Sequence, residues 1–136
     1  MFKNTNALIT LSLLLFQLIA CNKEPYKPDT TLVGGYVIGK ETCNTNEAND
    51  YWLIDLTYLP NTRQYGDTLL LVNGEYYTNV VKTKGLTDTV KHIGKAVDIE
   101  FKTITSNKII TTGCNAANPI TYNLKEIFVI NLGEIR

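Results

Sequence analysis

The sequence predicts a single all-β domain, and three observations support that prediction. Aromatic and β-branched residues are plentiful among the 136 residues, and Tyr alone occurs 8 times; such side chains favour half-buried, pleated strands. Lys95–Thr105 alternates between apolar and polar side chains, which is the period of a strand. Asn73-Gly74 stands between two apolar segments, and this is the strongest short signal for a β-hairpin. The length suits one domain rather than two.

Strands are expected from Leu32 onward. Val33–Lys40 is the first, and its glycines are expected to mark a bulge or a close backbone approach. Residues 124–132 are apolar on both faces, as a strand covered on both sides would be. The other expected strands are Tyr51–Thr57, Lys95–Thr105, and 68–72 and 75–81 on either side of the hairpin turn.

A short helix is expected between the hairpin and the Lys95 strand. Leu86, Val90 and Ile93 fall at helical spacing, and Gly94 is suited to end one or two turns. His92 is then a residue at the helix end rather than a base. The predicted order is three strands, a short helix and two strands.

That order resembles the OB-fold, a five-stranded Greek-key barrel. The entry to the fourth strand, 94–97, is typical of it, and the phrases 65–69, 73–74 and 79–81 are similar to small OB-like lipoproteins of Bacteroidota that lack an assigned activity. The resemblance covers most of residues 32–134 and implies a small OB-like barrel over residues 32–136. The alternative, a seven-stranded immunoglobulin-like sandwich, needs more strands than the pattern supplies.

Residues 1–20 have the three regions of a secretory signal. Lys3 gives a positive start, and an apolar run follows to Ala20 that is short for a bilayer span of about 20 residues. The end of the run resembles a bacterial lipobox, which implies cleavage before Cys21 and attachment of lipid to its thiol and new amino terminus. The residues of that motif are Leu18, Ile19, Ala20 and Cys21. The alternatives are an ordinary signal peptide or a buried helix that ends in Cys.

Residues 21–31 are expected to form the lipidated cysteine and a flexible tether. The segment is polar and carries Pro25 and Pro28, so it should run extended. Asn22, rather than Asp, follows the cysteine; by resemblance to the enterobacterial sorting rule this favours the outer membrane. Lys23-Glu24 is similar to surface-export signals of Bacteroidota lipoproteins, which usually carry more acidic residues. The expected location is the cell envelope, with the periplasmic or surface face left open.

Charge excludes one class of partner. The chain has 13 basic and 13 acidic side chains, and removal of residues 1–20 takes Lys3 away, leaving 12 against 13, or −1. Such a chain has no electrostatic bias toward nucleic acid. The expected partners are the membrane, through the N-terminal lipid anchor, and envelope proteins or glycans.

Cys43 and Cys114 remain once Cys21 is lipidated. In an oxidising space outside the inner membrane, such a pair is most simply a disulfide. On the OB reading the two cysteines lie in neighbouring loops. The alternatives are a redox pair, for which the C-x-x-C spacing is missing, and a metal site, which would need His92 and a carboxylate to converge on both thiolates. We expect no metal and no cofactor.

No catalytic residues are predicted. Residues 21–136 contain one serine, Ser106, and one histidine, His92, so a serine triad would have to use both. Carboxylates could pair for glycoside hydrolysis, although about 100 folded residues rarely build the deep cleft such enzymes use. Those carboxylates are Asp50, Asp55, Asp67, Asp98 and Glu100.

Two pairs of adjacent aromatic residues, Tyr51-Trp52 and Tyr76-Tyr77, lie within expected strands. Neighbours in a strand point to opposite faces, so one member of each pair is expected to face out. An exposed aromatic ring can stack on a sugar or a protein partner. The alternative is that a small barrel uses these large side chains only to fill its interior.

Three threonines are candidate modification sites. Thr30, Thr68 and Thr89 each follow an Asp, in tripeptides that resemble the O-glycosylation acceptor of Bacteroidota. The alternative is ordinary turn and cap chemistry, which favours Asp and Thr anyway. A glycan would require each threonine to be exposed.

The sequence therefore predicts a membrane-anchored, non-catalytic binding or accessory module of the cell envelope. The alternatives are a structural subunit of an envelope assembly, a small glycan-directed hydrolase and an enzyme inhibitor. A binding module should show an open groove with aromatic walls, a structural subunit an apolar patch or an uncovered sheet edge, and an enzyme carboxylates or His92 converging in a pocket.

Overall fold

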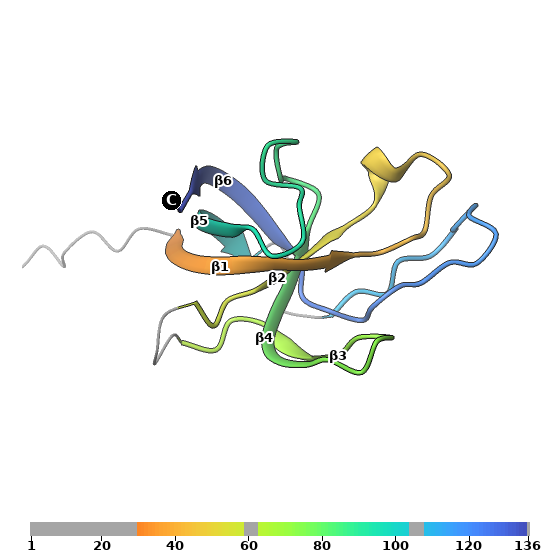
Figure 1. The fold of residues 1–136 in the computed structure, drawn as a ribbon, viewed down its shortest axis with the longest axis horizontal. Coiled ribbons are helices and arrows are strands. Elements are labelled where there is room, and N and C mark those ends of the chain that lie inside the picture. Colours follow the sequence, from red (N-terminus) through yellow and green to blue (C-terminus); the bar gives the residue numbers. More distant parts are fainter. Residues whose placement is uncertain (1–29, 59–62, 104–107, 136) are drawn as a thin grey trace, which may run out of the picture.

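The computed structural model describes residues 30–58, 63–103 and 108–135. This part of the chain is all-β, with one six-stranded antiparallel sheet and a single turn of 3-10 helix, η1 (Glu47–Asn49) (Figure 1). The strands are β1 (Thr31–Lys40), β2 (Trp52–Asp55), β3 (Asp67–Leu70), β4 (Tyr76–Thr83), β5 (Ala96–Thr103) and β6 (Ile127–Glu134). The expected signal peptide and most of the expected tether lie outside the described residues. No helix in the described ranges is long and apolar enough to cross a membrane.

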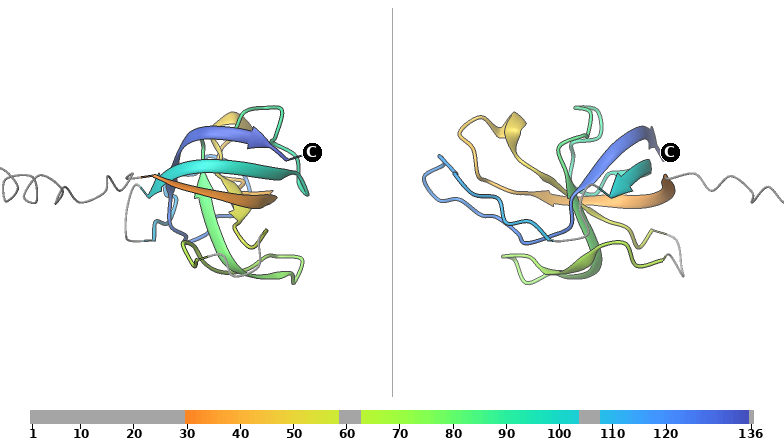
Figure 2. Two further views of the ribbon diagram at one scale, coloured as in Figure 1. Left: turned by 90° about the vertical axis from the view of Figure 1, so that its left-hand side faces the viewer. Right: turned by 180° about the vertical axis from the view of Figure 1, so that it is seen from behind.

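The strands lie in the order β3-β4-β2-β1-β5-β6, with every neighbouring pair antiparallel. The sheet is strongly coiled, so that β4 runs across the direction of β1, β5 and β6 (Figure 2). A parallel bridge joins Lys82 near the end of β4 to Glu126, which immediately precedes β6. The Lys82 N–H donates to the Lys125 carbonyl at 3.0 Å. The curl thus brings β4, which is second in the strand order, into contact with the start of β6 at the far end of that order.

The predicted all-β class is confirmed, but the count of five strands is not. The two arms of the hairpin around Asn73-Gly74, each expected as a strand, form β3 and β4, whereas the five-strand order has room for only one of them. The predicted turn is confirmed: Gly74 has a φ of +89°, and the Leu71 N–H donates to the Glu75 carbonyl at 2.9 Å.

The short helix expected between β4 and β5 is replaced by successive turns. The Val90 N–H donates to the Thr87 carbonyl three residues back, at 3.1 Å, and the helix does not continue. β-Branched side chains, here Thr87, Thr89 and Val90, disfavour a helix. Leu86 and Val90 are nevertheless buried. Their spacing therefore identified two buried residues correctly, but the helix that it predicted is wrong.

Two apolar clusters pack on opposite faces of the central strands. Ile54 and Val81 belong to the first cluster, while their neighbours Leu53 and Val80 belong to the second; successive strand residues point to opposite faces. β5, β6 and the turns with Leu86 cover the first face. Leu124, in the segment before β6, is part of the second cluster.

The glycines of β1 have the predicted roles. The register of β1 against β2 shifts between Val37 and Gly39, which is a bulge. A Cβ atom added to Gly35 would lie 2.9 Å from the Asp55 carbonyl oxygen, so β1 can lie this close to β2 only without a side chain there.

The predicted disulfide is also confirmed. Cys43, in the loop after β1, is bonded to Cys114, in the segment between β5 and β6, with a Cα–Cα distance of 4.6 Å. Asp50 organises the same loop, because its Oδ1 accepts from the backbone N–H groups of Cys43 at 3.0 Å and Asn44 at 2.9 Å.

Candidate binding cavity

A cavity of about 330 Å³ lies beside the middle of β1. It is lined by β1, the end of β2, the start of β4 and the turn that precedes β5. The side chains that line it include Tyr36, Ile38, Asp55, Glu75, Tyr77 and Ile93. Its volume falls at the lower end of the range for small-molecule sites. Its walls are aromatic and aliphatic with two carboxylates, and none of the described residues that line it is basic.

The strand register explains why these residues meet. Tyr36 and Asp55 are directly opposite each other across β1 and β2, so both side chains leave the same face of the sheet. Ile38 sits at the bulge and packs with the second cluster, which also contacts Tyr77. The turn before β5 is held against β1, because the Gly94 N–H donates to the Val37 carbonyl at 2.7 Å. That contact places Ile93 at the rim, where it is 74% exposed.

Asp55 is the unusual member of the cavity. Its side chain is buried, with the residue only 6% exposed, and its Oδ2 accepts a hydrogen bond from the Thr57 hydroxyl. Its Oδ1 is buried and has no hydrogen-bond partner among the described residues. Burial raises the pKa of Asp55 above its ordinary value of 3.8, against the opposing effect of hydrogen bonds from Thr57. A buried polar atom without a partner is rare in folded proteins and calls for an explanation.

Glu75 and Tyr77 form the more open side of the cavity. The Tyr77 hydroxyl donates to Glu75 Oε2 at 3.1 Å, and the Asn73 amide donates to the same oxygen at 2.9 Å. Burial, the hydrogen bond to Glu75 and the charges of Glu75 and Asp55 together raise the pKa of Tyr77 above 10.0. Both carboxylates therefore act on one phenol, which makes this a region of negative potential.

The predicted binding aromatics are not all at this cavity. Only Tyr77 lines it; Tyr76 is 64% exposed on the strand β4, and Trp52 is half-buried against the first cluster. Tyr36, which the sequence analysis did not single out, is a lining residue that is 40% exposed. Tyr36 has no adjacent aromatic residue in its glycine-rich strand, so the criterion of adjacent aromatic pairs did not select it.

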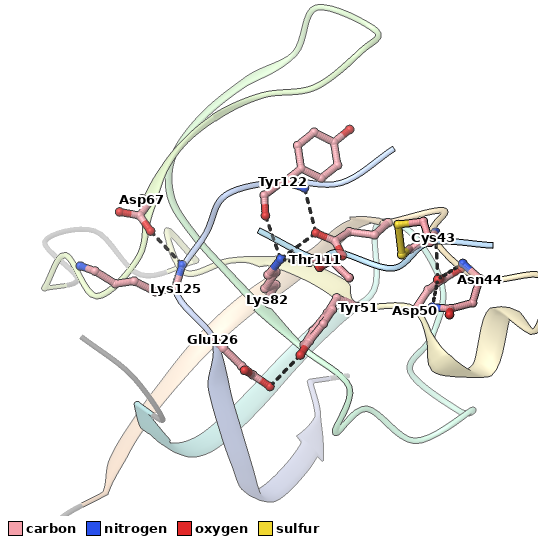
Figure 3. Close-up of polar contacts among 12 residues, drawn as sticks. Cys43, Asn44, Asp50, Tyr51, Asp67, Lys82, Thr111, Tyr122, Lys125 and Glu126 are labelled. Atoms are coloured by element: carbon pink, nitrogen blue, oxygen red, sulfur yellow. Dashed lines mark hydrogen bonds and ion pairs between the residues drawn. A yellow bond between two sulfur atoms is a disulfide. The ribbon is translucent and has the colours of Figure 1, made fainter. Parts of the chain in front are cut away.

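Tyr51 belongs to a different polar cluster (Figure 3). Its hydroxyl donates to Glu126 at 3.1 Å, and its ring lies 4.8 Å from the Lys82 ammonium and 4.6 Å from that of Lys84. Burial, and after it the charge and hydrogen bond of Glu126, raise the pKa of Tyr51 to about 12. The Tyr51 ring therefore makes cation–π contacts with Lys82 and Lys84.

Lys82 and Glu41 form a fully buried ion pair at the centre of that cluster. The Lys82 ammonium donates to Glu41 at 2.8 Å, to the Thr111 hydroxyl at 3.0 Å and to the Tyr122 carbonyl at 2.8 Å. Glu41 also accepts from the Thr111 hydroxyl at 2.6 Å and from the Tyr122 N–H at 2.8 Å. Every donor of this lysine is used, so the pair is structural.

Of the carboxylates considered for hydrolysis, only Asp55 lies at the cavity. Asp50 holds the disulfide loop, Asp67 accepts from the Lys125 N–H, Glu100 accepts from Thr30, and Asp98 is exposed. Glu75, which was not among them, joins Asp55 instead. His92 is exposed and is not a lining residue, and Ser106 lies outside the described residues.

The remaining candidate residues stay predictions. Thr68 and Thr89 are exposed, as glycosylation would require, whereas Thr30 is half-buried and donates to Glu100 at 2.7 Å. Leu18, Ile19, Ala20 and Cys21 lie outside the described residues. Within the described ranges, no three His, Cys, Asp or Glu side chains gather as metal ligands.

Comparison with known proteins adds no relative. No protein family matches the chain, no curated protein matches it, and no solved structure matches its fold.

Proposed function

We propose that this protein is a lipid-anchored, non-catalytic binding module of a bacterial cell envelope, and that its ligand occupies the cavity beside β1. The observation that carries the proposal is the Asp55 Oδ1, which has no hydrogen-bond partner among the described residues and lies at a cavity with tyrosine walls. A buried acceptor is costly to leave unpaired, by roughly 1–3 kcal/mol. A ligand that donates to it would remove that cost.

The domain is proposed to be an OB-like barrel. Strands β4, β2, β1, β5 and β6 are consecutive neighbours, and the parallel bridge from β4 to the residue before β6 supplies the closing contact of such a barrel. β3 is then an extension of the central hairpin. OB barrels bind ligands over the face of their second and third strands. In this correspondence β2 and β4 hold those positions, and they contribute Asp55 and Tyr77 to the cavity.

The anchor is proposed to be the lipidated Cys21. The lipobox-like residues before it support the proposal, and the Cys43–Cys114 disulfide agrees with an oxidising compartment outside the cytoplasm. A tether of about ten residues would let the domain stand away from the bilayer, where envelope proteins or glycans could reach it.

Membrane fractionation with intact mass measurement tests this location. The full chain would be produced in a Gram-negative host. We expect it in the membrane fraction, with the mass of residues 21–136 plus acyl chains. Cys21→Ser should abolish lipidation and processing, whereas the matched change Cys43→Ser should leave the lipid in place. A wild-type mass that begins at Met1 without lipid would contradict the anchor.

A structural subunit is the second candidate. The β3–β4 hairpin exposes Leu70, Val72 and Tyr76, and β3 lies at the end of the strand order. An apolar hairpin on an edge strand is a potential protein-contact surface. Chemical cross-linking in native membranes checks this: loss of a specific cross-link in Val72→Lys would favour the structural role.

A further inference from the structure

We infer that the cavity beside β1 binds a compact primary ammonium group, carried either by a free alkylamine or by a lysine side chain. The inference rests on the proposed binding function and names its ligand class. The acceptor is the Asp55 Oδ1, which has no partner in the described part of the chain. Glu75 contributes charge at the open side, and Tyr36 and Tyr77 form the aromatic walls.

The charges at the cavity favour a cation. Asp55 and Glu75 line it, and no Lys, Arg or His of the described ranges does. An anion would meet two carboxylates without a counter-charge. A neutral hydroxyl could donate to Asp55, but it would leave the negative charge of this buried group unbalanced. An ammonium group both donates the missing hydrogen bond and balances that charge.

The walls of the cavity fit the rest of an alkylamine. Cations are attracted to the faces of tyrosine rings, and the exposed Tyr36 and half-buried Tyr77 supply two rings here. Ile38 and Ile93 offer apolar surface to an alkyl stem. A hard metal ion fits less well, because Mg²⁺ and Ca²⁺ need about six or more oxygen ligands.

The buried Lys82 shows how this same chain holds an ammonium group. Its Nζ is bound by the Glu41 carboxylate and two further oxygens, and it lies 4.8 Å from the Tyr51 ring. The cavity offers the corresponding groups, a buried carboxylate and tyrosine rings, without a lysine of the lining to fill them. The proposed ligand would complete the arrangement.

NMR titration of the purified full-length protein with n-butylammonium tests the inference. We expect saturable shifts at the lining residues, whereas 1-butanol and butyrate, which have the same length, should produce none. Asp55→Asn should weaken binding by about tenfold to a hundredfold, since the bond to a charged partner is lost. Asp98→Asn, an exposed site with the same change of charge, should bind like the wild type.

Glu75→Gln provides a second variant at an exposed position, where folding is not at risk, and it should weaken binding by less than about fivefold. Equal binding of 1-butanol and butylammonium would overturn the inference, as would unchanged binding in folded Asp55→Asn. Nα-acetyl-lysine-N-methylamide separates the two sources: tighter binding than butylammonium indicates a lysine side chain, and weaker binding a free amine.

Methyl β-D-glucoside serves as the probe that separates this inference from the proposed function. If the glucoside saturates the cavity and butylammonium does not, the amine inference is wrong and the binding function stands. If butylammonium, the lysine derivative and the glucoside all leave the lining residues unshifted, the inference is overturned and the cavity no longer supports a binding role.

Discussion

Two buried carboxylates in this small domain have opposite surroundings. Glu41 accepts hydrogen bonds from Lys82, Thr111 and the Tyr122 backbone, so both of its carboxylate oxygens have partners. Asp55 is almost as deeply buried, but only Thr57 donates to it, and its Oδ1 has no partner in the described part of the chain. Asp55 lines the cavity beside β1, and Glu41 is not among the described residues that line it.

The difference in hydrogen bonding is the basis for a structural role of Glu41 and for the proposed binding role of Asp55. A fully bonded buried ion pair fixes the position of the segments that carry its members. A carboxylate that is buried without full bonding lowers the stability of the fold, and such costs are commonly found at functional sites. Substitutions at the two positions should therefore change the free energy of unfolding in opposite directions.

The largest effect is expected from Lys82→Met. This change leaves the Glu41 carboxylate buried without its cation, which typically costs about 3–5 kcal/mol. The free energy of unfolding from urea denaturation measures the loss. As a control, Lys82→Met combined with Glu41→Leu removes both charges and should recover most of it. A single variant as stable as the wild type would show that the pair is not structural.

Removal of the disulfide should cost nearly as much. Cys43 and Cys114 are 71 residues apart in sequence, and closing a loop of that length is worth about 4 kcal/mol on the chain-entropy model. The bond also lies two residues from Glu41, so its loss should loosen the ion-pair cluster more than the cavity. We expect amide hydrogen exchange in Cys43→Ser/Cys114→Ser to increase more around Glu41 than around Asp55. Equal increases at both sites would contradict this.

Asp50 provides a third buried carboxylate for the comparison. It accepts three hydrogen bonds, from the backbone N–H groups of Cys43 and Asn44 and from the side-chain amide of Asn44. Like Glu41, it should therefore stabilise the fold. Asp50→Ala leaves the buried Cys43 N–H unpaired and should lower the free energy of unfolding by about 1–3 kcal/mol. Asp50→Asn keeps an acceptor and should lose less. Thermal unfolding of the two variants is the check.

The pattern of residues along the sequence predicted the all-β class and several local features of this fold. Alternation predicted the strands, Asn73-Gly74 predicted the hairpin, and the two cysteines other than Cys21 predicted the disulfide. The turns before β5 were not predictable in this way, because Leu86 and Val90 are buried at a spacing that a helix and irregular turns can share. The contacts of this segment with the rest of the fold determine that it forms turns rather than a helix.

The cavity was harder to foresee than the fold. Asp55 was one carboxylate among several, and only the register that sets it opposite Tyr36 distinguishes it from the others. Glu75 reaches the site through the hairpin turn, and Ile93 through the contact of Gly94 with Val37. Long-range pairing brings these residues together, and no local sequence pattern encodes it.

The smallest change in the free energy of unfolding is expected from Asp55→Asn. The sign of this change is more informative than its size. Because the pKa of Asp55 is raised by burial, the folded state binds a proton more readily than the unfolded state does. Stability therefore falls as pH rises from the ordinary value of 3.8 through the raised pKa. The variant, which carries no charge, should lack this loss, so its advantage should be present at pH 7 and absent below pH 3.8. Neighbouring Glu75 and Tyr77 are unchanged in the variant and serve as the common background.

The free energy of unfolding at pH 7 of Asp55→Asn, measured beside Glu41→Gln, tests the account most directly. We expect Asp55→Asn to gain about 0.5–2 kcal/mol, the usual size of a stabilising substitution. Glu41→Gln, which leaves Lys82 buried without its anion, should lose about 3–5 kcal/mol. If both variants lose stability to a similar extent, Asp55 is a structural residue like Glu41, and the binding role of its cavity is contradicted.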